Sequence, residues 1–154
     1  MLPDRSLAIV AYRGAQEAAV LGLADLLDTA NAISKGQGGI VIAVHTVRPG
    51  ELPSRSEHYD AIILPPNRSG ARGDDDTDLH GWIRARHGAG TLTASACAGL
   101  FWLGHAGLLA SRPVTTHWAL EAEVRSAFPD ADLQSEHLLI DDNDIVTAGG
   151  MMAW

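Results

Sequence analysis

Residues 91–118, TLTASACAGLFWLGHAGLLASRPVTTHW, decide how the chain is organised, because they place its one cysteine, Cys97, at a strand-to-helix turn. Thr91–Ser95 contains β-branched residues, as a buried strand does, and the apolar run after Gly99 begins a helix. A nucleophile at such a turn needs small residues two positions before and two positions after it. Ser95 and Gly99 meet this requirement, so the pattern predicts a nucleophile elbow at Cys97.

Two interpretations of Cys97 follow from the residues alone. In the first, the opening turn of the helix points free N–H groups at the sulfur, which favours the thiolate and a reactive side chain. In the second, Cys97 is an inert small hydrophobe, as most free cysteines in protein cores are. The elbow pattern favours the reactive interpretation without excluding the other.

The composition limits the class of protein. A chain of 154 residues that is 46% hydrophobic predicts one soluble domain with enough core to fold alone. Lys and Arg number 11 against 19 Asp and Glu, which gives a net charge of −8 and a pI near 5.2 and argues against nucleic acid as a direct partner. A single cysteine excludes an internal disulfide, and no apolar run has signal-segment or membrane-spanning character. We therefore expect a cytoplasmic protein that does not bind a membrane.

Short apolar strands alternate with helical segments along the chain. This βαβ rhythm predicts an α/β fold with an open, mostly parallel sheet and helices on both faces. In the first helix, the period places Val20, Leu23, Ala24, Leu27 and Ala30 on one buried stripe. The expected strands are 7–12, 40–47, 61–64, 91–95 and a hairpin over 138–147, and the expected helices are 17–32, 74–87 and 118–128.

Two segments after the third strand bear on ligand binding. Asn67–Gly73 is rich in Gly, Arg and Ser, which predicts a mobile loop at the edge of the sheet where open α/β folds bind ligands. The run Asp74-Asp75-Asp76 fits either a cation site or the start of a helix. We favour the helix start, because carboxylates offset the helix dipole and a plain run does not supply converging metal ligands. We expect neither a metal nor a cofactor.

Residues 95–118, SACAGLFWLGHAGLLASRPVTTHW, resemble the cysteine-elbow region of the ThiJ/PfpI superfamily, whose members have a class I glutamine-amidotransferase-like, flavodoxin-like fold. Within it, the sequence is most similar to the amidase-like amino-terminal domain of AraC-type transcriptional regulators. There a similar CxGxxxLxxAGLLxGxxxTTHW is followed by an acidic hairpin and a Gly-rich start to the last helix, and Leu139–Ala153 has this pattern here. The resemblance covers nearly the whole chain and implies one domain over residues 1–154, ending within its last helix and containing no DNA-binding domain.

The resemblance implies three site residues. Cys97 matches the elbow cysteine, and His117 matches the histidine of the family's TTH segment. Asp25, which by itself has the pattern of a solvated helix carboxylate, lies in AAVLGLADLLDTAN, similar to the family stretch ending in GPxE, whose carboxylate approaches the sulfur. One position departs from the relatives: peptidase-like members have His directly after the cysteine and isocyanide hydratases have a hydroxyl residue, whereas this chain has Ala98.

Two functions of different classes are consistent with these residues. The first is a small-molecule-sensing domain of an AraC-type regulator, a homodimer with its ligand above Cys97 in a pocket lined by Asp25, His117 and Asn67–Gly73. The second is a cysteine-dependent hydrolase or lyase/hydratase, similar to isocyanide hydratases. In that case the Cys97 thiolate attacks an electrophilic carbon, Asp25 or His117 moves the proton, and backbone N–H groups stabilise the oxyanion. We favour sensing, because the overall resemblance is to regulator domains and because Ala98 removes a group that the enzymes use.

Overall fold

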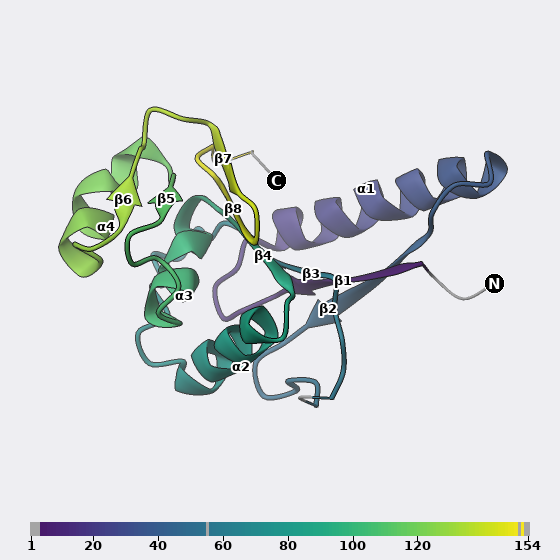
Figure 1. The fold of residues 1–154 in the computed structure, drawn as a ribbon, viewed down its shortest axis with the longest axis horizontal. Helices are drawn as coiled ribbons and strands as arrows, with labels where there is room; N and C mark the ends of the chain where they lie inside the picture. Colours follow the sequence, from purple (N-terminus) through teal and green to yellow (C-terminus); the bar gives the residue numbers. More distant parts are fainter. Residues whose placement is uncertain (1–3, 55, 151, 153–154) are drawn as a thin grey trace.

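Six strands form one sheet in the computed structural model, which describes residues 4–54, 56–150 and 152 (Figure 1). The strand order is β2-β1-β3-β4-β8-β7. All neighbouring pairs are parallel except β7 with β8, which pair in antiparallel fashion at the edge. This arrangement confirms the predicted flavodoxin-like, mostly parallel fold. The strands are β1 (Arg5–Val10), β2 (Ile42–Val47), β3 (Ala61–Leu64), β4 (Leu92–Ala96), β7 (Leu139–Asp142) and β8 (Ile145–Ala148).

Helices cover both faces of this sheet. The long helix α1 contacts β1 and β2, whereas α2 and α3 pack against each other and against β4, on the other side of the sheet (Figure 1). Two short strands, β5 (Pro113–Val114) and β6 (Asp132–Leu133), form a separate parallel pair beside α4. The helices are α1 (Glu17–Gly36), α2 (Thr77–Gly88), α3 (Leu100–His105) and α4 (Glu121–Ala127), and single 3-10 turns, η1 (Cys97–Gly99) and η2 (Trp118–Leu120), precede α3 and α4.

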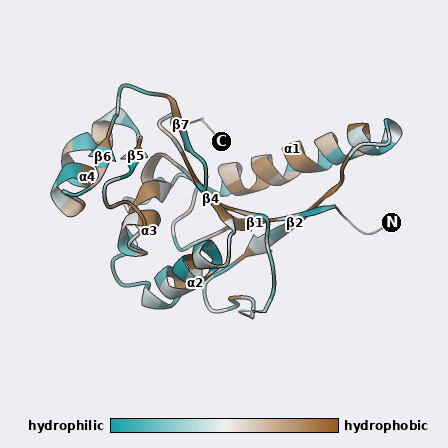
Figure 2. Cartoon of the chain, in the orientation of Figure 1, coloured by the Kyte–Doolittle hydropathy of each residue, from teal (hydrophilic) through white to brown (hydrophobic). Residues whose placement is uncertain are grey.

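The main hydrophobic core lies between the sheet and the layer of α2 and α3. Leu100, Phe101, Trp102 and Leu103 are at most 1% exposed, as expected for a helix that is apolar on every side, and α3 is accordingly brown in Figure 2. The buried positions of β3, Ile62 and Leu64, alternate with half-buried ones, so one face of this strand is covered more completely than the other.

Helix α1 departs from the prediction at its second half. Among its residues only Ala19, Val20 and Leu23 are fully buried, and Ala30, which the predicted stripe would bury, is exposed. The cause is a mismatch in length. A helix of 20 residues spans about 30 Å, whereas strands of six residues such as β1 and β2 span about 20 Å. The end of α1 therefore extends past the sheet (Figure 1).

The acidic run begins a helix, as predicted. The Oδ1 atom of Asp76 accepts a hydrogen bond of 3.4 Å from the Leu79 N–H, which makes Asp76 the N-cap of α2. Within the described residues, none of the helices combines the length and the apolar character needed to cross a bilayer.

Candidate functional site

The elbow at Cys97 is built from a strained backbone and a glycine. Strand β4 ends at Ala96, and Cys97 follows with φ +53°, in the left-handed region that non-glycine residues rarely occupy. Two residues later, a Cβ atom on Gly99 would collide with the carbonyl oxygens of Leu64 and Pro65. The small residue that the sequence places here is therefore needed for the strand end and the helix start to pass closely.

A pocket of about 150 Å³ opens over this elbow. It brings together Cys97 and His117, two of the three predicted site residues, from separate segments of the chain. We call it the cysteine pocket. Its lining residues are Asn67, Gly70, Arg72, Cys97, Ala98, His117 and Leu120.

Asp25, the third predicted site residue, does not line this pocket. Asp25 is exposed on α1, and it lies about 12 Å along the helix axis from Glu17 at the start of that helix. The start of α1 is the end nearest the cysteine pocket, because the Gln16 N–H donates to the Pro66 carbonyl just after β3. The structure thus groups Cys97 with His117 and not with Asp25, whose proposed role as a proton carrier stays a prediction.

The electrostatics of Cys97 oppose the expected thiolate. Burial is the largest effect, and it raises the pKa of the thiol above its ordinary value. A hydrogen bond from the Ala98 backbone and the charge of Arg72 both lower this pKa, but they do not offset the burial. The opening of the helix is present as predicted, yet its N–H groups are outweighed by desolvation. Burial therefore favours the protonated thiol over the thiolate.

His117 is oriented by its own backbone. Its Nδ1 accepts a hydrogen bond of 3.2 Å from the Ala119 N–H, so the side chain caps the turn η2. In a neutral imidazole one nitrogen accepts and the other carries the proton, and here the accepting nitrogen is occupied. In this geometry a neutral His117 is the Nε2–H tautomer, which offers a hydrogen-bond donor and no free lone pair to take a proton from the Cys97 thiol.

Arg72 lines the cysteine pocket, and the sequence did not single it out. Its guanidinium holds both carboxylate oxygens of Glu123 on α4, at 2.6 and 2.8 Å, and lies over the Phe101 ring at 4.7 Å from the centroid. This bidentate pair lowers the pKa of Glu123. The loop over residues 67–73, predicted to be mobile, is thus held against α4. A second contact within it, from the Asn67 side-chain amide to the Ala71 carbonyl at 2.9 Å, closes the turn.

Three further contacts stabilise the elbow and the strand ends next to it. The hydroxyl of Thr116 donates to the Cys97 carbonyl at 2.8 Å, which joins the segment carrying His117 to the elbow. The rings of Tyr12 and Trp102 stack with centroids 3.8 Å apart, and the Tyr12 hydroxyl donates to the Pro65 carbonyl. Burial raises the pKa of Tyr12, so this hydroxyl stays protonated and a donor. In the described part of the chain there is no group of three or more His, Cys, Asp or Glu residues placed to hold a metal ion.

This fold with a cysteine elbow corresponds to a known family. The model of the DJ-1/PfpI family matches residues 13–154. The chain belongs to the DJ-1/PfpI family. No curated protein matches the sequence at a significant level.

The solved structures that are similar in fold to this DJ-1/PfpI domain include transcriptional regulators. An AraC family transcriptional regulator from Pseudomonas putida is 13% identical with a TM-score of 0.78, and the match covers 97% of this chain and 85% of that one. A protein from Vibrio parahaemolyticus, provisionally named a transcriptional regulator, is 21% identical with a TM-score of 0.78 over 96% and 84% of the two chains. DJ-1beta from Drosophila melanogaster is 17% identical with a TM-score of 0.76 over 97% and 83%. At these identities the likeness establishes the shared fold.

Proposed function

We propose that this DJ-1/PfpI domain is the small-molecule-sensing part of an AraC-type transcriptional regulator, with its ligand in the cysteine pocket against Cys97 and His117. Two observations at the site residues support the proposal. The thiol is buried with a raised pKa, and the accepting nitrogen of His117 is already occupied by a backbone N–H. Such a pocket presents a neutral sulfur and a hydrogen-bond donor but no general base, which suits binding better than covalent catalysis.

Ligand binding without turnover is the property to test. The protein is incubated with a panel of small nitrogen-containing and electrophilic metabolites, the midpoint of thermal unfolding is recorded, and the mixture is analysed by mass spectrometry. A sensing domain is stabilised by a ligand that is recovered unchanged. Cys97→Ser keeps that shift, because the pocket keeps its shape and its donor. Consumption of the compound by the wild type and not by C97S contradicts the sensing role.

The regulator assignment has its own test in the native gene. A native reading frame that continues into a helix-turn-helix segment supplies the DNA-binding output, and a reporter downstream of its promoter then responds to the ligand found above. A native protein without any DNA-binding segment contradicts the regulator role, even if the domain binds a ligand.

The enzymatic alternative, a cysteine-dependent hydrolase or lyase/hydratase, keeps one observation in its favour. Cys97 adopts φ +53°, and strained backbone of this kind is concentrated at functional sites. The Ala98 N–H beside the sulfur would serve as an oxyanion donor. Asp25, predicted as a proton carrier, is exposed on α1, so the alternative lacks a base at the sulfur.

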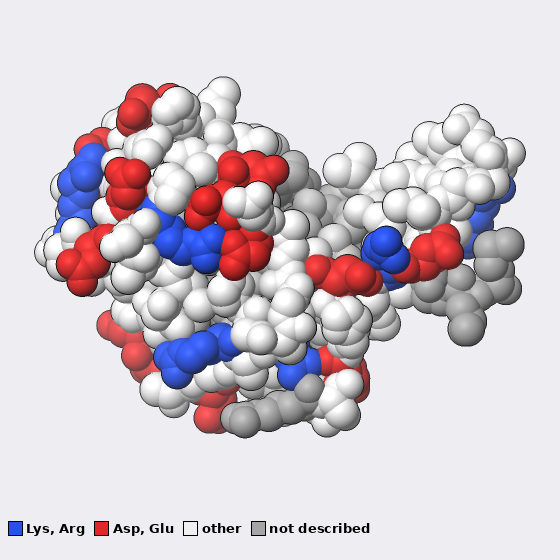
Figure 3. Space-filling view, in the orientation of Figure 1, with Lys and Arg blue, Asp and Glu red and all other residues white. Residues whose placement is uncertain are grey.

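We extend the proposal to a cytoplasmic homodimer that pairs through α1. Leu26 and Ile33 are 60% and 58% exposed and lie seven residues apart, on one face of the helix. Figure 3 shows that the end of the molecule formed by this helix carries mostly uncharged side chains. The test is light scattering after size exclusion: Leu26→Glu should yield monomers, whereas Leu21→Glu, on a different face, should not. A wild type that is monomeric overturns the dimer.

A further inference from the structure

A second and larger cavity lies on the other side of Arg72 from the cysteine pocket. It has a volume of about 960 Å³ and is bounded by the turn after β1, by Pro49 after β2 and by residues 69–76 after β3. In the strand order β2-β1-β3, the chain passes from β1 to β2 on one side and then from β2 back past β1 to β3 on the other, so the order reverses between β1 and β3. Open α/β sheets bind ligands at this switch point, outside the carboxyl ends of the strands. We call this cavity the switch-point pocket.

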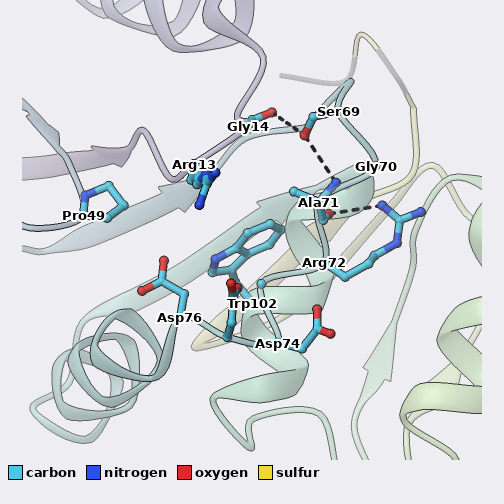
Figure 4. A pocket seen from close by; sticks show the side chains of 12 residues that line it. Arg13, Gly14, Pro49, Ser69, Gly70, Ala71, Arg72, Asp74, Asp76 and Trp102 are labelled. Carbon is cyan, nitrogen blue, oxygen red and sulfur yellow. Dashed lines mark hydrogen bonds between the residues drawn. The ribbon is translucent and has the colours of Figure 1, made fainter.

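Three kinds of polar group meet in the switch-point pocket without partners of their own. Arg13 is exposed and makes no hydrogen bond or ion pair with any residue that the structure describes. The carboxylates of Asp74 and Asp75 are exposed and equally unpaired within the described ranges. The third group is the indole N–H of Trp102. In Figure 4, Arg13 lies above the indole ring, while Asp74 and Asp76 lie below it.

The Trp102 N–H is the observation that points to a ligand. Trp102 is 1% exposed, and its Nε1 is buried without a hydrogen-bond partner among the described residues. In Figure 4 the nitrogen edge of the ring faces the side of the pocket where Asp76 and Arg13 lie. A buried donor left unsatisfied is costly, and a ligand oxygen that accepts from it relieves that cost. Glycine at position 73 keeps a side chain off this edge, since a Cβ added there would lie 2.8 Å from Nε1, and its φ of +74° belongs to a backbone that only glycine adopts freely.

We propose that the switch-point pocket binds a small amino carboxylate. The ligand's carboxylate pairs with the Arg13 guanidinium and accepts from the Trp102 N–H, and its ammonium group lies against Asp74 and Asp75. A pocket that offers both unpaired donors and unpaired carboxylates selects a molecule that carries both charges, because an anion alone meets Asp74 and Asp75 and a cation alone meets Arg13. This site is separate from the cysteine pocket, so the inference goes beyond the proposed function and can hold if that function fails.

The test uses matched probes and calorimetry. Glycine, 4-aminobutanoate and 6-aminohexanoate are compared with the carboxylates and amines of the same chain lengths. At least one amino carboxylate should bind about tenfold more tightly than its matched carboxylate and its matched amine, the factor expected for one added charge-assisted hydrogen bond. Binding should shift the indole ¹H–¹⁵N resonance of Trp102, which is assigned by its loss in Trp102→Phe.

Variants separate the two kinds of charged group. Arg13→Gln should weaken the binding of the amino carboxylate and of the plain carboxylate about tenfold. The double variant Asp74→Asn with Asp75→Asn should weaken the binding of the amino carboxylate only. Arg68→Gln removes an exposed arginine of the loop over residues 67–73 and should change the binding of neither compound. Cys97→Ser should also leave this binding intact, which separates the outcome from that of the sensing proposal. Three results overturn the inference: no probe binds, the amino carboxylate binds no better than its matched compounds, or saturation leaves the Trp102 resonance unmoved.

Discussion

The two cavities at the carboxyl ends of the strands differ in how their polar groups are satisfied. In the cysteine pocket the Nδ1 of His117 and the carbonyl of Cys97 are hydrogen-bonded within the protein, and burial raises the pKa of the thiol. In the switch-point pocket, Arg13 and the exposed carboxylates of Asp74 and Asp75 have no protein partner among the described residues. The comparison teaches that packing around the elbow satisfies the polar groups of the cysteine pocket within the protein, whereas the loop residues of the switch-point pocket leave charges available to a ligand.

The largest effect on stability is expected from a substitution at the base of the cysteine pocket. Gly99→Ala places a Cβ against the Leu64 and Pro65 carbonyls, which are backbone and cannot turn away. We expect the free energy of unfolding to fall by about 3 kcal/mol, as for severe overpacking of a core, measured by urea denaturation. Gly81→Ala is the matched control, because Gly81 lies inside α2 with open space around its Cβ position. That change should stabilise by about 0.5–1 kcal/mol; an equal loss in both variants would contradict the packing argument.

The second prediction concerns the wall between the two pockets. A double-mutant cycle with Arg72→Met and Glu123→Gln should give a coupling energy of about 1 kcal/mol, at the upper end for partly exposed pairs because this one is bidentate and lies over Phe101. The pair Arg125 and Glu121 on α4, with side chains 52% and 41% exposed, is the control. Its coupling should be about 0.3–0.5 kcal/mol, as for other helix pairs at this spacing. Equal couplings would show that Arg72 is not a structural clamp.

The third prediction sharpens the contrast in charge. Burial raises the pKa of Cys97, so the folded protein holds the thiol proton more tightly than the unfolded chain. Alkylation by iodoacetamide should therefore be slow at pH 7 and should still be rising above pH 9. The free energy of unfolding should decline over the same range, because ionisation favours the unfolded state there, and Cys97→Ser should remove that part of the slope. Alkylation that reaches its plateau below pH 8 would instead indicate a reactive thiolate.

The smallest expected effect tests the orientation of His117. His117→Ala removes the cap of η2 and should cost about 0.5–1 kcal/mol, while His117→Asn, whose side chain also caps well, should cost less than about 0.5 kcal/mol. Equilibrium unfolding measures both. Equal losses for Ala and Asn would mean that the Nδ1 contact contributes nothing and that the ring is free to act as a base.

Much of the fold was readable from the sequence because it depends on local pattern. Strand β3 has the predicted bounds, Ala61–Leu64, and the apolar run after Gly99 forms a buried helix. The acidic hairpin was also predicted, but the arginine that pairs with its carboxylates was not. Arg112 donates to Asp142 at 2.8 Å and also binds Asp144, a contact between distant segments that no local pattern reveals.

The sequence by itself determined the βαβ order, the elbow at Cys97 and the need for a small residue at Gly99, because strand and helix periodicity and backbone crowding act over a few neighbouring residues. Tertiary structure alone decided which side chains meet at the sulfur. It placed Arg72 beside Cys97 and kept Asp25 on an exposed helix face, and it raised the pKa of the thiol that a helix start would otherwise lower. These outcomes depend on long-range packing and desolvation, which have no signature in residue spacing.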